Sequence, residues 1–359
     1  HPKVDLPFLL QFYHSNTTQN KPMITNQIHP ITRKRYLSVF LVFFTLSMLF
    51  IPTKIHAQSS QESRIETFTI PMPQLGDRPK NIQVYLPPDY DSSEKSYPVF
   101  YLHNGDDLFN PRPDAVGDYK VDETLDELFF NGSLGGVIVV GIEVDRSSPW
   151  DEYMPWVNEN MRDWVNSNNS DPVQGGDGFN FIEFIVHTLK PEIDSRFRTL
   201  PDRDNNAIGG FCRGAIFPII TGISYPDVFS RVMAMSPAVW MAEEGGAWLS
   251  NNNLINYINN TAMPENVLFY LEIGTEESSG SRPPIKDQDG KRITYPQAYL
   301  EGAQSVYESL LSNGIPDANI EFRIIEGSKG GRDTWGTLIG EVVMWFFSEE
   351  KTPPPERPT

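Results

Sequence analysis

A single cysteine marks the stretch of this sequence that could do chemistry. Residues 205–215 form a short apolar run that carries the pattern Gly-x-Cys-x-Gly around Cys212 and then continues as a helix-like run. This pattern is typical of a sharp strand-to-helix turn that lifts one side chain above a sheet, where the side chain can attack a carbonyl carbon. The chain has 1 cysteine, so Cys212 cannot form an intramolecular disulfide. The alternative is a buried, inert thiol, because free cysteine is among the most buried residue types.

The elements around this turn alternate between strands and helices. Apolar or alternating runs predict strands at residues 64–70, 81–86, 97–102, 136–144, 207–211, 231–235, 266–273 and 320–325. Helical periodicity predicts helices at 121–130, at 179–189 with an end at Lys190-Pro191, from the Cys212 turn to about Ser224, at 299–313, and at about 337–348. This alternation predicts one α/β domain built on a parallel sheet.

The ends of the chain are expected to lie outside that domain. Arg33-Lys34-Arg35, an uncharged apolar run at 36–51 and the small residue Ala57 have the order of a secretory signal peptide, whose apolar run is shorter than the roughly 20 residues of a spanning helix. We therefore expect an upstream segment and signal peptide at 1–57, a domain at 58–350 and a disordered Pro-rich tail at 351–359. Secretion or a periplasmic location follows, with no membrane anchor after cleavage.

Composition narrows the class of partner. The formal net charge of −18 argues against nucleic acid and against anionic membrane surfaces, because both are polyanions. The sequence carries no EF-hand spacing and no Cys/His cluster, so it indicates no cofactor and no dedicated metal site.

A long loop-like stretch at 147–178 is rich in aromatic residues. Loops of this length are usually functional or act as lids. Trp150 and Trp156 could form a stacking platform for a sugar or an aromatic ring, and Trp240 is a further candidate for substrate binding. A self-packed lid is the alternative.

From about Ile82 to Phe347 the chain resembles the Putative esterase family of α/β-hydrolases, which includes enterochelin esterase-like and feruloyl esterase-like proteins. The resemblance rests on the ordered segments VYLPPDY (84–90), YPV (97–99), HNGDDLF (103–109), KPEIDSRFRT (190–199), YPDVF (225–229) and SPAVW (236–240). It implies an α/β-hydrolase fold, with a single mostly parallel sheet flanked by helices. It also implies a carboxylic ester hydrolase that acts on a small-molecule or carbohydrate-linked ester.

The resemblance also assigns candidate catalytic residues. The nucleophile falls on Cys212, where the family normally has serine, and the acid falls on Glu277, with Glu276 as its neighbour. The oxyanion hole would use backbone N–H groups at Asn104 or Gly105 and at Arg213.

The family's histidine is missing from its expected place. The family has it five residues before a tryptophan, and Trp335 puts that position at Gly330. Beyond the signal peptide the histidines are His103 and His187. His103 lies in the loop near the expected oxyanion hole, so it is the candidate replacement base, with packing and loop shaping as its alternative role. His187 is expected to be a structural or surface residue.

Two functions remain open. A cysteine thiol has an ordinary pKa of about 8.5, which leaves a few per cent thiolate at neutral pH, so Cys212 could be acylated without a base. The first hypothesis is therefore a weak ester hydrolase that transfers an acyl group through Cys212. The second is a non-catalytic pseudo-esterase that binds a carbohydrate or an aromatic ligand. If only the base is missing, Gly330→His should raise turnover.

Overall fold

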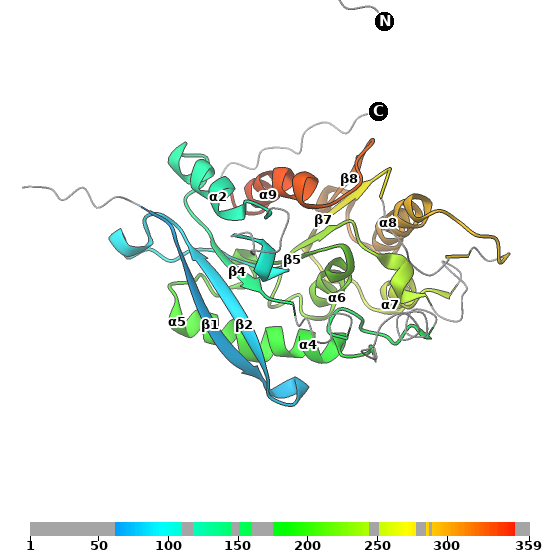
Figure 1. Cartoon of the computed structure of the whole chain (residues 1–359), viewed down its shortest axis with the longest axis horizontal. Coiled ribbons are helices and arrows are strands. Elements are labelled where there is room, and N and C mark those ends of the chain that lie inside the picture. Colours follow the sequence, from blue (N-terminus) through cyan, green and yellow to red (C-terminus); the bar gives the residue numbers. More distant parts are fainter. Residues whose placement is uncertain are drawn as a thin grey trace, which may run out of the picture. The chain divides into compact units, whose positions relative to one another are not determined.

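The computed structural model describes residues 62–109, 118–144, 151–159, 175–243, 251–277, 285–286 and 289–348 (Figure 1). The chain divides into two units, residues 1–58 and 59–359. The described residues all belong to the second unit. The predicted signal peptide and Pro-rich tail lie outside them.

The described part of the second unit contains one sheet of eight strands, in the order β1-β2-β4-β3-β5-β6-β7-β8. The strands are β1 (Arg64–Met72), β2 (Arg78–Leu86), β3 (Val99–His103), β4 (Ile138–Ile142), β5 (Asn206–Phe211), β6 (Arg231–Met235), β7 (Leu268–Gly274) and β8 (Ile320–Ile325). The pairs β1–β2 and β2–β4 are antiparallel, and every pair from β4 to β8 is parallel. The predicted mostly parallel sheet is thus confirmed.

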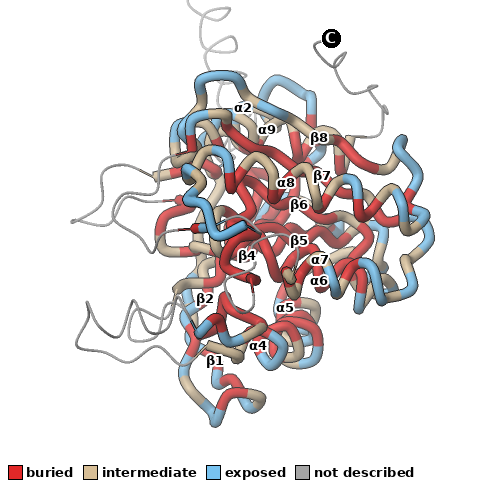
Figure 2. The backbone as a smooth tube through the Cα atoms, turned by 90° about the vertical axis from the view of Figure 1, so that its right-hand side faces the viewer, coloured by how far each residue is buried: buried red, intermediate tan, exposed pale blue. Residues whose placement is uncertain are grey.

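Helices cover both faces of the sheet (Figure 1). They are α2 (Val121–Phe130), α4 (Gly178–Phe184), α5 (Lys190–Arg196), α6 (Ile216–Ser224), α7 (Asn253–Asn260), α8 (Tyr295–Ser312) and α9 (Arg332–Phe347). Apolar side chains of α2 and α9 pack with one face of the sheet, and those of α4 to α8 pack with the other. Figure 2 shows the buried residues concentrated along the central strands and the inner sides of the helices.

Most predicted elements occur close to their predicted bounds, and the largest differences are in the helices. The predicted helix end at Lys190-Pro191 is wrong, because a π-helical turn, η5 (Ile185–Leu189), leads directly into α5. Pro191 is tolerated because it lies in the first turn of α5, beside that widened turn. Helix α7 was not predicted, and α9 begins five residues before the predicted start at residue 337.

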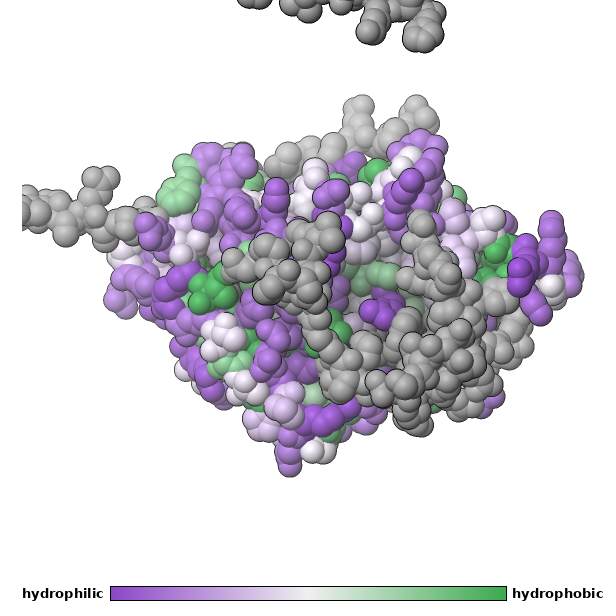
Figure 3. Space-filling view, in the orientation of Figure 1, coloured by the Kyte–Doolittle hydropathy of each residue, from purple (hydrophilic) through white to green (hydrophobic). Residues whose placement is uncertain are grey.

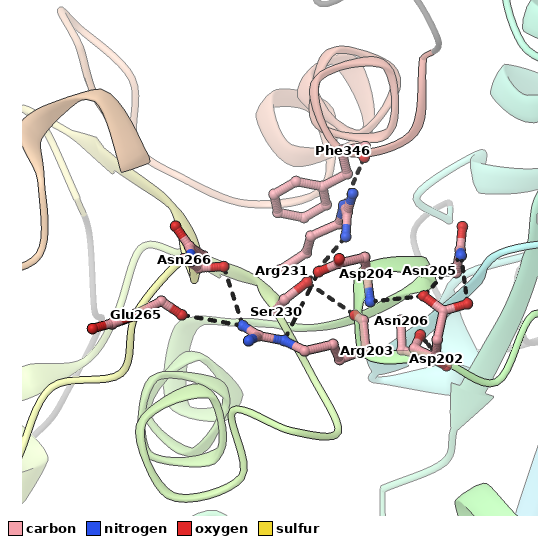
Figure 4. A network of polar contacts seen from close by, with 10 residues as sticks. All are labelled: Asp202, Arg203, Asp204, Asn205, Asn206, Ser230, Arg231, Glu265, Asn266 and Phe346. Atoms are coloured by element: carbon pink, nitrogen blue, oxygen red, sulfur yellow. Dashed lines mark hydrogen bonds and ion pairs between the residues drawn. The ribbon is translucent and has the colours of Figure 1, made fainter.

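Two arginines tie together the amino ends of the central strands (Figure 4). Arg203 donates from Nη2 to the carbonyl oxygens of Glu265 (3.3 Å) and Asn266 (3.1 Å), just before β7. Arg231, the first residue of β6, donates from Nε to the carbonyl oxygen of Phe346 (2.7 Å) at the end of α9. Burial lowers the pKa of Arg231. These contacts hold the amino ends of the central strands, on the side of the sheet opposite to the Cys212 turn.

In the view of Figure 3, the hydrophobic residues among those that the structure describes lie singly or in small groups among hydrophilic ones. Among the helices that the structure describes, none is long and apolar enough to cross a membrane. Within the same residues no group of three or more His, Cys, Asp or Glu side chains could hold a metal ion.

Candidate active site

Cys212 lies on a sharp turn at the carboxyl end of β5. Its backbone has a φ of +53°, and the 3₁₀ turn η7 (Cys212–Ala215) leads from it into α6. The flanking glycines permit this turn: a Cβ atom on Gly210 would lie 1.8 Å from the carbonyl oxygen of Gly214. No other residue fits at position 210 without moving the turn. The structure therefore has the strand-turn-helix geometry that the Gly-x-Cys-x-Gly pattern predicts.

The thiol is half-buried at the junction of the two halves of the core. Cys212 packs against the apolar clusters on both faces of the sheet. Its Sγ atom lies 3.4 Å from Oη of Tyr299, within hydrogen-bond distance for sulfur. Tyr299 is a buried residue of α8, and its ring stands edge-on to Trp240 at 6.2 Å. Sequence reasoning missed Tyr299, because only the packing of α8 brings it to the Cys212 turn.

Glu277 is buried and held by donors at the carboxyl ends of the neighbouring strands β6 and β7. One of its oxygens, Oε1, accepts hydrogen bonds from Ser236 Oγ (2.5 Å) and from the backbone N–H of Gly274 (3.3 Å). Ser236 in turn accepts a hydrogen bond from Nε1 of Trp335 (3.0 Å). Glu276 is exposed, and its backbone N–H donates to the carbonyl oxygen of Ser328. Of the two candidate acids, the side chain of Glu277 is the one that points into the protein.

A second carboxyl group, which sequence reasoning missed, lies beside Glu277. Glu272 is fully buried on β7, and its Oε2 lies 3.4 Å from the same Ser236 hydroxyl. Burial, and then the negative charge of Glu277, raise the pKa of Glu272 to about 8. Glu272 is therefore mostly protonated at neutral pH, and the Ser236 hydroxyl lies between it and Glu277.

Gly330 lies directly against Glu277. A Cβ atom on Gly330 would be 2.4 Å from Oε2 and 2.5 Å from Oε1 of that carboxylate, and the residue has a φ of +66°. The backbone N–H of Gly330 donates to Ser328 Oγ at 3.2 Å. The position to which Trp335 assigns the missing histidine is thus beside the candidate acid, but the Glu277 carboxylate occupies the space that a side chain at position 330 would enter.

His103 is enclosed by aromatic rings. Its ring centroid lies 3.8 Å from that of Phe217, 4.7 Å from Tyr153 and 5.1 Å from Phe181, and within the described part of the chain neither ring nitrogen has a hydrogen-bond partner. Burial, reinforced by the positive charge of Lys80, holds the pKa of His103 well below its ordinary value. Among the described side chains it has no hydrogen bond to Cys212. This geometry favours packing over a role as the base.

His187 is a surface residue, as expected. Its side chain is 56% exposed, and Nε2 lies 3.2 Å from a carboxylate oxygen of Glu183. It takes no part in the arrangement around Cys212.

The candidate oxyanion donors follow β3 and β5, which are neighbours in the sheet. Asn104 comes directly after β3 with a φ of +60°, and its amide Nδ2 donates to Tyr119 Oη (3.3 Å) while Oδ1 accepts from Tyr153 Oη (3.2 Å). Gly105 must be glycine, because a Cβ atom there would lie 2.5 Å from the carbonyl carbon of Gly141. Because β3 and β5 are parallel neighbours, the residues that follow them, Asn104, Gly105 and Arg213, lie on the same side of the sheet. A shared oxyanion hole formed by their backbone N–H groups stays a prediction.

The tryptophans predicted to bind substrate lie in different surroundings. Trp150 is outside the described residues. Trp156 packs against Phe179 (5.4 Å) and Tyr257 (6.1 Å). Trp240 is buried beside Tyr295 and Tyr299. Tyr299 in turn contacts the Cys212 thiol. A role of Trp156 or Trp240 in substrate binding stays a prediction.

The model of the family described as "Putative esterase" matches residues 74–339. The chain belongs to this esterase family. Among curated relatives, the uncharacterized protein YbbA of Bacillus subtilis is 20% identical over 273 residues, which cover 76% of this chain and 94% of YbbA. Family membership supports ester hydrolysis as the class of reaction.

Solved esterase structures share the fold. A ferulic acid esterase is 18% identical with a TM-score of 0.56, covering 80% of this chain and 98% of its own. An IroE-like serine hydrolase from Shewanella oneidensis is 18% identical with a TM-score of 0.59, covering 79% of this chain and 80% of its own. The enterobactin esterase of Shigella flexneri is 15% identical with a TM-score of 0.54, covering 79% of this chain and 59% of its own. At these identities the likeness establishes the α/β-hydrolase fold of this esterase-family chain.

Proposed function

We propose that the protein is a carboxylic ester hydrolase that accepts an acyl group on Cys212 and releases it slowly. The observation that carries this proposal is the position of Cys212, at a φ of +53° on the turn between β5 and α6, half-buried and without a disulfide. This is where a nucleophile stands in this fold, and the residue there is a thiol.

Acylation needs no histidine in this proposal. A few per cent of an ordinary thiol is thiolate at neutral pH, and the thiolate is intrinsically a strong nucleophile. The Cys212 thiolate attacks the ester carbonyl carbon, and the C–O bond to the alcohol breaks. Backbone N–H groups at Asn104 or Gly105 and at Arg213 are the proposed donors to the carbonyl oxygen. Activated and aryl esters, whose alcohols leave easily, are the best substrates for such a site.

Deacylation is the slow step in this proposal. Water must be deprotonated as it attacks the thioester, and a positioned base typically contributes about 10²–10⁴-fold to such a step. The carboxylate of Glu277 is engaged with Ser236 and lies against Gly330, and among the described residues no imidazole stands beside it. The acyl-thioester should therefore accumulate.

The substrate is proposed to be a small-molecule or carbohydrate-linked ester encountered outside the cytoplasm, after removal of the signal peptide predicted at residues 1–57. The similar solved structures are named for esters of ferulic acid and enterobactin. Trp240 and Tyr299 are buried aromatic neighbours of Cys212, and an aromatic acyl group would stack against them if it entered beside the thiol.

A non-catalytic pseudo-esterase is the second candidate. The direct contact between the Gly330 main chain and Glu277 favours it, because the contact occupies the space that a histidine would need. Such a protein would bind a carbohydrate or aromatic ligand near Cys212 without turning it over.

The two candidates are separated by burst kinetics with a short-chain aryl ester, measured beside Cys212→Ala. We expect a burst of about one product per protein, followed by slow turnover, and an acyl adduct on the peptide that contains Cys212 in mass spectrometry. Equal rates in the two proteins, with no adduct, would exclude acyl transfer through Cys212 and leave the pseudo-esterase.

A further inference from the structure

The Cys212 thiol has a phenol beside it. Tyr299 Oη lies 3.4 Å from Sγ, and among the described side chains Tyr299 is the one that brings a polar atom within hydrogen-bond distance of the sulfur. Tyr299 comes from α8, 87 residues further along the chain, so the contact depends on tertiary packing. Its ring is 2% exposed, which leaves the hydroxyl little freedom to turn away.

We propose that Tyr299 is a catalytic residue that donates a hydrogen bond to the Cys212 thiolate and so sets how much of the thiol is ionised. This inference rests on the proposed acyl transfer through Cys212. A phenol has an ordinary pKa of about 10, so near neutral pH a tyrosine hydroxyl is a hydrogen-bond donor and not a base.

The contact acts on the charged form of the sulfur. Hydrogen bonds to an ionised acceptor are about twice as strong as those between neutral groups. Tyr299 therefore stabilises the thiolate more than the thiol. The thiol proton leaves to solvent, the C–S bond forms as the C–O bond breaks, and the alcohol takes a proton from solvent. In the acyl-enzyme the sulfur is neutral, and the hydrogen bond weakens.

The start of α8 holds the phenol in place. Thr294 caps the helix by accepting a hydrogen bond from the backbone N–H of Gln297 (3.3 Å), and Pro296 lies in the first turn, where a missing N–H has no cost. Tyr299 follows one turn later with its ring against Trp240 at 6.2 Å. A rigid ring on a capped helix places the hydroxyl with little loss of entropy.

The test is the pH dependence of alkylation of Cys212 by iodoacetamide, in wild type and in Tyr299→Phe. Removing a hydrogen bond to a charged group should move the midpoint up by about one pH unit. The matched control is Tyr307→Phe on the same helix, because Tyr307 donates to Asp317 (2.8 Å) and its loss should leave the midpoint unchanged. An unchanged midpoint in a folded Tyr299→Phe variant would overturn the proposal.

A second replacement avoids the loss of the hydroxyl. Substituting 3-fluorotyrosine for Tyr299 makes the phenol a stronger donor with almost the same shape. At a pH where the fluorinated phenol still holds its proton, a larger fraction of Cys212 should be thiolate and alkylation should be faster than in wild type. A rate that does not change, or falls, contradicts the proposal even if Tyr299→Phe does not fold.

The readout separates this inference from the proposed function, because alkylation needs no ester. Midpoints that shift as expected in a protein that forms no acyl adduct would support the hydrogen bond and reject the esterase. An acyl adduct with unmoved midpoints would do the reverse. A thiol that iodoacetamide does not reach at any pH would overturn both.

Discussion

The main chain of Gly330 lies against the carboxylate of Glu277, so closely that a Cβ atom on Gly330 would stand 2.4 Å from Oε2. Glu277 cannot move aside freely, because Ser236 Oγ and the Gly274 N–H both donate to its other oxygen. Position 330 therefore admits a side chain only if the loop after β8 shifts.

The first prediction concerns this contact. Gly330→Ala should lose about 1–2 kcal/mol of unfolding free energy because φ is +66°, and about 1–3 kcal/mol more from overpacking against Glu277. Gly327→Ala is the matched control, because Gly327 has a similar φ of +72° and a Cβ atom there would meet nothing within 4 Å. Chemical denaturation should show the larger loss for Gly330→Ala. Equal losses would mean that the contact with Glu277 relaxes at little cost.

The second prediction revises the expectation for Gly330→His. A histidine at this position meets the Glu277 carboxylate at its Cβ atom, so its imidazole cannot be placed unless Glu277 or the loop moves. We expect lower thermal stability than wild type and no gain in turnover of an aryl ester. A variant as stable as wild type that turns over faster would show that the loop opens readily and that only the base was missing.

The third prediction separates thiol from hydroxyl chemistry. Cys212→Ser keeps the shape of the turn but replaces the thiol with a hydroxyl, which is a far weaker nucleophile without an adjacent base. Without a base, acylation should slow by at least about 10²-fold, as judged by the burst rate with an aryl ester. A serine variant that is as fast as wild type would mean that an unrecognised base serves position 212.

The fourth prediction concerns the pH dependence of stability. The pKa of Glu272 is raised from its ordinary 4.5 to about 8 in the folded protein, so between these values the folded state holds a proton that the unfolded state has lost. The stabilising effect of this proton is complete below the lower value and disappears as the pH rises through the upper one.

Glu272→Gln should remove that contribution. Between about pH 5 and about pH 8, the free energy of unfolding should fall less in the variant than in wild type. The difference between the two falls should be a few kcal/mol, since one pKa unit corresponds to about 1.4 kcal/mol. Urea unfolding at the two pH values measures the difference. Parallel pH profiles for the two proteins would contradict a protonated Glu272.

The fifth prediction concerns a buried ion pair beside His103. Lys80 Nζ lies 2.6 Å from Glu152 Oε2, and both side chains are 2% exposed. Lys80→Met removes this cation from the buried Glu152 carboxylate and should cost about 3–5 kcal/mol of unfolding free energy. The double variant Lys80→Met/Glu152→Gln should restore part of that loss. The control is Arg196→Met, which breaks a pair with Glu192 whose side chains are 44% and 35% exposed, and should cost less than about 1 kcal/mol. Similar losses for the two single variants would contradict the importance of burial.

The sequence predicted the elements whose patterns are local. The bounds of β6, β8 and α2 agree with the predicted ones, because each is a compact run of apolar or periodic residues. The continuation of the helix through Pro191 was not predictable, since the helix accepts this proline only because a π turn precedes it. Helix α7 was missed because its apolar positions are separated by asparagines, which are typical of loops.

In the candidate site, too, the features that depend on neighbouring residues were predictable, and those that depend on tertiary packing were not. The turn at Cys212 and the assignment of Gly330 relative to Trp335 could be derived from short patterns, because each depends on neighbours in sequence. Contacts that cross the sheet could not: Tyr299 reaches Cys212 from α8, and Glu272 meets Glu277 through Ser236. The three aromatic rings that enclose His103 also come from elements distant in sequence, so no local pattern predicts this enclosure.

Because the chain has 1 cysteine, a single probe can be attached to the protein at a defined position. Any thiol-directed fluorophore or spin label will attach at the β5–α6 turn alone, without prior removal of other cysteines by mutagenesis. The emission or mobility of such a probe would report on the surroundings of Tyr299 and Trp240 in real time, and binding of an unlabelled compound nearby could be followed without any chemical reaction.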